Sequence, residues 1–227
     1  MMVVDDDPAP LTDDELAAVA VFPLPRLVFF PHTALPLHLF EPRYQRMIED
    51  CMKKGPGALV VTMLAPGHDA EYHAQPPMKK VACVGRVVAH ERINDGRHNI
   101  VLSGMSRVRL EELPMGDLPY RRATAHRLED IGTGSGRDVA ALLACASPII
   151  AAVQREHPEF SIDMSADTPA GQLADILADR LIADPNVRQE VLETLEVSTR
   201  CDKMVGALSE LMALLLHNED GSNTMLS

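Results

Sequence analysis

The chain has 227 residues, of which 46% are hydrophobic and 24% charged, and its formal net charge is −12. This is the balance of a soluble globular protein, with length for one large domain or two small ones. The acidic start lacks the basic residues of a secretory signal, and no apolar run reaches the roughly 18 residues of a membrane span. We therefore expect a cytoplasmic protein with no membrane segment.

The charge is distributed unevenly along the chain. Residues 1–20 hold six acids and no base, residues 22–127 hold 15 Lys/Arg against 10 Asp/Glu (net +5), and residues 128–227 hold 6 against 17 (net −11). Such asymmetry predicts two modules with different surfaces, which could attract each other or pair head to tail in a homo-oligomer. The four cysteines form no CxxC pair, so we expect free thiols and no zinc site.

The first 44 residues are acidic at the start and proline-rich afterwards. Residues 1–20 are predicted to be a flexible tail, in which Thr12 and Glu15 can form the capping box of a short helix over 13–20. Five prolines then lie among apolar residues in FPLPRLVFFPHTALPLHLFEPRY, residues 22–44. Each proline removes a donor from a strand ladder, so short, bent strands at sheet edges are expected there.

A helix is predicted over 42–53, where Pro42 suits the first position and Tyr44, Met47, Ile48 and Cys51 share one face. A buried strand follows at 58–64. Two β-rich runs, 81–93 and 98–113, are joined by Asn94-Asp95-Gly96, which is typical of a hairpin. Gly85 and Gly104 inside these runs indicate bulges of a small closed barrel, completed by a strand over 120–129.

The remaining chain changes to helical periodicity after IGTGSGR, residues 131–137, which has the composition of a flexible linker. A helical bundle is predicted over 138–217. Its first helix, 138–157, is expected to be buried and to bend at Pro148. Two further helices start at Thr168-Pro169 and Asp184-Pro185. The last helix carries a seam with 4-3-4-3-4 spacing, formed by Val197, Cys201, Met204, Leu208, Leu211 and Leu215. Residues 218–227 are expected to be a flexible tail.

No pattern for catalysis or cofactor binding emerges. GTGSGR lacks the GxxxxGK[ST] pattern of a phosphate-binding loop, and SGMS, residues 103–106, is not a GxSxG nucleophile elbow. His68 and His73 lie on a proline-flanked loop without the spacing of metal ligands. The prediction is a protein that is not an enzyme and holds no metal or cofactor.

Two surfaces remain as candidates for binding. The proline-rich segment 31–44 has more large apolar residues than a short strand needs, so part of it is a candidate groove for extended peptides, although burial in the core is the commoner fate of such residues. Arginines of the β half form the alternative, an RNA- or anion-binding face made of Arg107, Arg109, Arg121 and Arg122. With eight aromatic residues and no tryptophan, a base-stacking platform is poorly supplied, and the acidic half repels phosphate, so nucleic acid is disfavoured.

Several motifs together resemble the Lon protease N-terminal, substrate-binding domain family. They are the opening run FPLPRLVFFPHTALPLHLFEPRY, Pro119-Tyr120, the Asp-Pro…Gln-Glu-Val-Leu-Glu run, and the hairpin with Gly85, Asp95, Gly96, Arg97, Gly104 and Arg107. The likeness spans residues 21–217. One departure is His32, where the family often has glycine.

The resemblance implies an α+β fold, with a PUA-like β-barrel over 21–130 followed by the helical bundle. In full Lon this region holds protein substrates, and an ATPase and a Ser-Lys protease domain follow it. We therefore expect a stand-alone, non-catalytic module that binds unfolded or extended polypeptides, with a full-length protease or a chaperone as a further partner. The residues expected to contact the polypeptide are Leu37, Leu39, Phe40, Arg43 and Tyr44.

Overall fold

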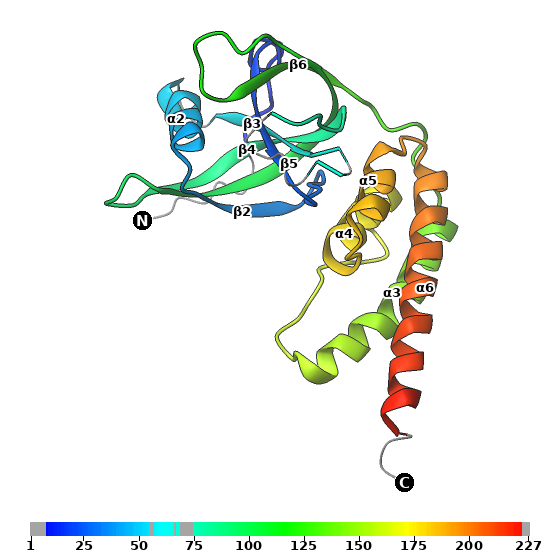
Figure 1. The fold of residues 1–227 in the computed structure, drawn as a ribbon. Helices are drawn as coiled ribbons and strands as arrows, with labels where there is room; N and C mark the ends of the chain where they lie inside the picture. Colours follow the sequence, from blue (N-terminus) through cyan, green and yellow to red (C-terminus); the bar gives the residue numbers. More distant parts are fainter. Residues whose placement is uncertain (1–7, 55–56, 66, 69–74, 224–227) are drawn as a thin grey trace. The chain divides into compact units, whose positions relative to one another are not determined.

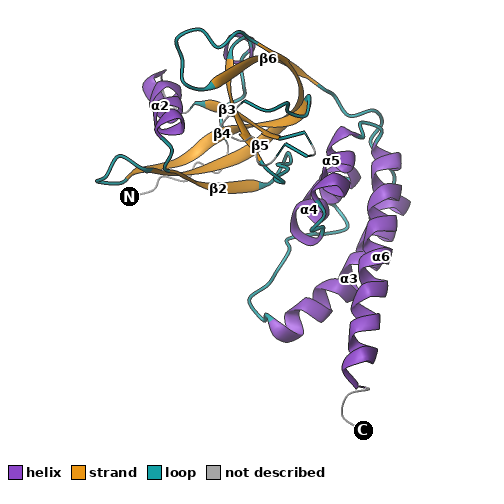
Figure 2. Cartoon of the chain, in the orientation of Figure 1, coloured by secondary structure: helices purple, strands orange, loops and turns teal. Residues whose placement is uncertain are grey.

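The computed structural model describes residues 8–54, 57–65, 67–68 and 75–223 (Figure 1). The chain divides into two compact units, Met1–Glu129 and Asp130–Ser227. The first consists mainly of strands and the second of helices, as Figure 2 shows. The fold class is therefore α+β, which confirms the prediction.

The strands of the first unit form one sheet that closes on itself. They are β1 (Val19–Leu24), β2 (Ala34–Leu39), β3 (Ala58–Met63), β4 (Val81–Arg92), β5 (His98–Glu112) and β6 (Arg121–Arg127). Their order is β2-β5-β4-β3-β1-β6, and β5 pairs with β6 as well. This last pairing closes β5, β4, β3, β1 and β6 into a ring and leaves β2 outside it, attached to β5. The β1–β3 pair is parallel, and the others are antiparallel.

Glycine allows two close approaches in the hairpin of β4 and β5. The register of this hairpin shifts between Val84 and Gly85, where a bulge was predicted. A Cβ atom on Gly104 would lie 2.0 Å from the carbonyl oxygen of Phe30. Only glycine therefore lets the segment before β2 cross β5 here.

Helix α2 (Pro42–Cys51) packs against the barrel core and continues as the 3-10 helix η1 (Met52–Lys54). Its buried face consists of Tyr44, Met47 and Ile48. These side chains pack into a cluster with residues of β1, β3 and β5. The helix predicted over 42–53 is confirmed.

The amino-terminal segment differs from the predicted tail from residue 10 onward. Helix α1 (Asp13–Leu16) begins at the capping box of Thr12 and Glu15, and Leu16 is buried in the barrel core. The buried Arg86 donates hydrogen bonds of 2.9 and 3.0 Å to Glu15 and one of 3.1 Å to the carbonyl oxygen of Pro10. A buried guanidinium needs these acceptors, so the segment is held on the barrel.

The second unit consists of α3 (Gly136–Glu156), α4 (Ala170–Leu181), α5 (Pro185–Glu193) and α6 (Val197–Asn223). Helix α6 packs along α3 and α4. Of its predicted seam, Val197, Cys201, Met204 and Leu208 are buried, and Leu211 and Leu215 are half-buried. The helix continues to Asn223, so residues 218–223 are not the predicted tail.

The predicted linker 131–137 is also an ordered part of this unit. The Ile131 amide donates to the carbonyl oxygen of Leu195, and the Val197 amide donates to that of Ile131. Ser135 and Asp138 form a capping box, so α3 begins at Gly136. The glycines here serve a tight connection rather than a flexible one.

Helix α3 runs through Pro148 as one helix, as expected for the apolar run that contains this proline. Among the described residues, α3 is the one helix that is long and apolar enough to cross a membrane, judged by length and composition alone. Core helices of soluble proteins pass the same test, so this is weak support for a membrane span.

A buried ionic cluster joins three parts of the helical unit. Arg200 on α6 is fully buried and donates hydrogen bonds of 3.0 and 2.5 Å to the two carboxylate oxygens of Asp130. Its Nε lies 3.8 Å from the buried Asp175 carboxylate on α4. Hydrogen bonds to Asp130 and the charge of Asp175 raise the pKa of Arg200 against the opposing effect of burial.

Candidate functional site

Strand β2 has one outer edge that no described strand covers. The His32 amide donates to the Gly104 carbonyl at 2.9 Å, and the Gly104 amide donates to the Thr33 carbonyl at 2.8 Å. His32 and Thr33 thus both lie opposite Gly104, which is the arrangement of a β-bulge. The φ of 61° at His32 is the left-handed conformation that the first residue of such a bulge adopts. That conformation favours glycine, although a histidine stands here.

The bulge determines which backbone groups of β2 point outward. In an antiparallel pair, residues facing the partner alternate with residues facing away. Counting from Gly104, the residues that face β5 are Leu35, Leu37 and Leu39, opposite Leu102, Ile100 and His98. The amides of Ala34 and His38 therefore point outward, together with the carbonyls of Ala34, Pro36 and His38. Pro36 takes a position where no donor to β5 is needed.

Phe40 follows directly after this edge and is 61% exposed. Its ring stacks with that of His38, with ring centroids 6.2 Å apart. The His38 ring in turn hydrogen-bonds Asn99 at 2.8 Å. A large apolar side chain thus stands beside a row of outward backbone donors and acceptors.

The other predicted peptide-contacting residues differ from Phe40. Leu39 is 1% exposed and Tyr44 is 3% exposed, and both belong to the barrel core. Leu37 packs partly against the same core. Arg43 is paired with Glu41 at 2.9 Å and lies over the Tyr44 ring. The prediction of Leu39 and Tyr44 as contact residues is corrected, because strand alternation and the helix face turn both inward.

The four arginines of the alternative site do not form one open basic face. Arg107 and Arg121 are 4% and 8% exposed, whereas Arg109 is exposed. Arg121 is held by Glu112 through two bonds of 2.7 Å and donates to the Pro76 carbonyl. Arg122 is half-buried. The predicted anion-binding face is corrected, since two of its charges are covered by the protein.

A histidine pair lies behind the carboxyl end of β2. Nε2 of His90 and Nδ1 of His98 are 2.8 Å apart, and the two rings are stacked. Burial lowers the pKa of both rings, and the charge of Arg92 lowers both further. The charge of Glu49 on α2 opposes the shift at His98. The lowered pKa values favour the neutral form of both rings next to the carboxyl end of β2.

The described side chains offer no cluster of metal ligands. They contain no group of three or more His, Cys, Asp or Glu residues that could hold a metal ion. His73 lies outside the described residues, so the prediction that His68 and His73 bind no metal stays untested. The outward edge of β2 was partly foreseeable, because a proline in a strand indicates an edge.

The sequence matches a family model described as the ATP-dependent protease La (LON) substrate-binding domain over residues 18–210. A Lon protease of Methylocella silvestris is 24% identical over 215 residues, which are 92% of this chain and 26% of that protein. A Lon protease of Anaeromyxobacter dehalogenans is 26% identical over 207 residues, covering 89% and 24%. The chain therefore spans about a quarter of the length of these curated relatives.

Two solved structures are similar in fold. A Lon N-terminal domain protein from Xanthomonas campestris aligns with a TM-score of 0.62 and 18% identity, covering 83% of this chain and 97% of that one. The N-terminal domain of Lon protease from the Mycobacterium avium complex aligns with a TM-score of 0.63 and 15% identity, covering 85% and 98%. At these identities the likeness supports the fold.

Proposed function

Because the chain belongs to the family of LON substrate-binding domains, we propose that it binds extended polypeptide segments at the outer edge of β2 and at Phe40. The observation that carries the proposal is the row of outward backbone groups on Ala34, Pro36 and His38. An extended segment can add a strand to such an edge and gain main-chain hydrogen bonds whatever its sequence. Phe40 then supplies an apolar contact beside the added strand.

The proposed activity is binding without catalysis. The region that the family model covers is a substrate-binding domain, and binding through backbone groups suits clients that share no sequence. Pro36 moderates the edge, because it breaks the row of donors and so limits uncontrolled pairing between copies. The edge is therefore suited to weak, reversible capture.

Binding to RNA is the competing activity, and salt distinguishes the two. We would measure the anisotropy of a labelled, unfolded, carboxy-amidated polypeptide and of a short RNA at low and moderate salt. Edge capture predicts polypeptide binding that tolerates salt, because few charges are neutralised. RNA binding falls steeply with salt.

The variant for this experiment is Phe40→Ala, and the control is Leu214→Ala, an exposed leucine of α6. We expect Phe40→Ala to weaken polypeptide binding about tenfold, the effect of losing one central apolar contact. Leu214→Ala should leave it unchanged. Salt-sensitive RNA binding alone, or unchanged affinity in Phe40→Ala, would contradict the proposal.

A further inference from the structure

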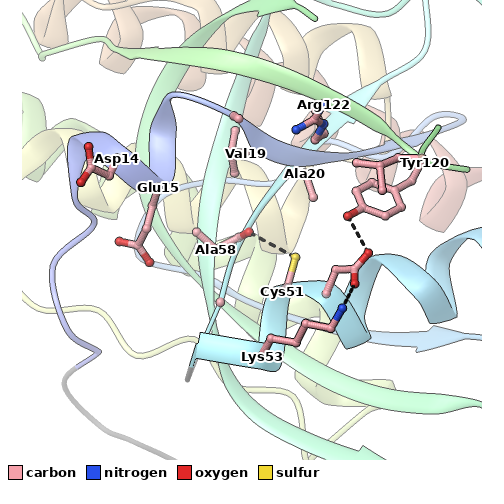
Figure 3. Close-up of a pocket in the computed structure, with 13 residues that line it drawn as sticks. Asp14, Glu15, Val19, Ala20, Cys51, Lys53, Ala58, Tyr120 and Arg122 are labelled. Carbon is pink, nitrogen blue, oxygen red and sulfur yellow. Dashed lines mark hydrogen bonds and ion pairs between the residues drawn. The ribbon is translucent and has the colours of Figure 1, made fainter. Parts of the chain in front are cut away.

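A cleft of about 480 Å³ lies on the barrel unit, between α1, the start of β1, the end of α2 and the segment before β6 (Figure 3). Its apolar wall comprises Val19, Ala20, Ala58 and Leu118. This volume is in the range of pockets that hold small ligands or single side chains. The cleft does not include β2 or Phe40, so it is separate from the proposed polypeptide edge.

Two carboxylates of the cleft are already engaged by the protein. Glu15 accepts two hydrogen bonds from Arg86, which lower its pKa to about 2. Asp50 accepts hydrogen bonds from Lys53, Arg46 and Tyr120, and its pKa is also lowered to about 2. In Figure 3, dashed lines mark the bonds that the Tyr120 hydroxyl and the Lys53 ammonium donate to this carboxylate. Both groups are charged, and both are neutralised.

Arg122 is different, because its charge has no partner among the described residues. It lies on β6 opposite Ala20 of β1 and contributes its side chain to the cleft wall. Its Nε is buried and makes no hydrogen bond, and no ion pair of its guanidinium is found in the described part of the chain. Buried arginine nitrogens are normally paired, so this group is ready for an anion from outside.

The chemistry of the cleft favours a monovalent carboxylate over a phosphate. A guanidinium binds a carboxylate through two parallel hydrogen bonds. Asp14 also lines the cleft and, unlike Glu15 and Asp50, makes no ion pair among the described residues, so its field penalises a dianion more than a single negative charge. The apolar wall beside Arg122 suits a carboxylate that carries an apolar neighbour.

We propose that this cleft binds the carboxyl terminus of a polypeptide, with the α-carboxylate on Arg122 and the last side chain on the apolar wall. The choice of a polypeptide rests on the proposed function, since a chain terminus combines these two groups. The cleft then recognises chain ends, whereas the β2 edge holds internal segments.

The test compares two forms of one labelled octapeptide that ends in Ala-Leu, the free acid and the carboxy-amide. We expect the free acid to bind at least tenfold more tightly by fluorescence anisotropy, because only it offers the charge to Arg122. A third peptide, amidated but with an internal Glu, tests whether any carboxylate suffices; equal binding of this peptide and the free acid would overturn the assignment to chain termini.

The variant Arg122→Gln should abolish the difference between acid and amide, and Arg122→Lys should retain part of it. Arg109→Gln, which removes an exposed charge from the same barrel, should leave the difference unchanged. Circular dichroism melting checks folding, which Arg122→Gln should preserve because no internal pair is lost. Equal affinity for acid and amide in the wild-type protein, or an acid preference that survives in Arg122→Gln, would overturn the proposal.

Failure of this inference is distinguishable from failure of the proposed function. The β2 edge is tested with an amidated polypeptide and Phe40→Ala, neither of which involves Arg122. If that binding persists in Arg122→Gln while the octapeptide acid shows no preference, the cleft proposal alone is overturned.

Discussion

Phe40 and Leu39 are neighbours in the chain, yet one is exposed and the other lies in the core. The richness of segment 31–44 in leucine and phenylalanine indicates a binding surface without saying which residues face it. Which residues face outward is determined by the pairing of β2 with β5, and this pairing starts at the bulge of His32 and Thr33. Because that bulge depends on the close approach of Phe30 to Gly104, sequence periodicity alone could not predict it.

The histidine pair predicts how stability depends on pH. Burial lowers the pKa of His90 and His98 below the ordinary value of 6.5, so folding favours their neutral forms. Their contribution is therefore fully present above pH 6.5 and is lost as the pH falls from 6.5 toward the lowered values. Glu15 and Asp50 make stability depend on pH only below about pH 4.5, because their pKa values are about 2 in the folded state and they are already ionised above that pH in both states.

We expect the melting temperature to fall between pH 7.5 and pH 5.5 for this reason. The fall should shrink in the double variant His90→Gln/His98→Gln, which does not titrate in this range. His157→Gln, at an exposed histidine of the other unit, serves as the control and should retain it. A melting temperature that stays flat over the range would contradict this reading of the pair.

At the scale of elements, the outward edge of β2 makes a direct prediction. His38→Pro removes one outward donor, whereas His38→Ala keeps that donor and removes only the ring, with its contacts to Asn99 and Phe40. One hydrogen bond contributes about 0.5–1.5 kcal/mol. We therefore expect His38→Pro to bind an amidated, unfolded polypeptide roughly threefold to tenfold more weakly than His38→Ala in anisotropy titrations. Equal affinity of the two variants would mean that the edge is not used.

The buried cluster of Arg200 predicts a large effect on the helical unit. Arg200→Met leaves the Asp175 carboxylate buried without this charge, so we expect a loss of about 3–5 kcal/mol in unfolding free energy. Lys203→Met lies on the same helix and removes only an exposed contact of 3.4 Å to Glu190, worth under about 1 kcal/mol. Urea denaturation followed by circular dichroism at 222 nm measures both. Similar unfolding free energies of the two variants would show that the Arg200 cluster contributes little to stability.

Elements with strong local signals were predictable, and elements held by distant partners were not. The hairpin of β4 and β5 and helix α2 follow from turn residues, glycines and periodicity. Residues 10–16 read as a tail because their partner, Arg86, lies 71 residues after Glu15. The segment 131–137 read as a linker for the same reason, since Ile131 and Asp130 are held by residues of the last helix and the turn before it.

At the scale of the whole molecule, the chain combines a barrel unit and a helical unit, and the proposed binding surfaces both lie on the barrel. The change from basic to acidic sequence occurs near residue 128, close to the unit boundary at Glu129 and Asp130. The distribution of charge along the sequence therefore predicted the division into two units. It could not predict that the side chains of Arg107 and Arg121 are buried, because burial depends on packing across the barrel.

Hydrogen exchange over the whole chain, with and without an amidated, unfolded polypeptide, tests the central claim most directly. In the free protein the outward amides of Ala34 and His38 have no strand partner among the described residues and should exchange quickly. Our account predicts that the polypeptide slows exchange in residues 34–40 and leaves residues 107–122 unchanged. Protection confined to residues 107–122, with none in 34–40, would contradict it.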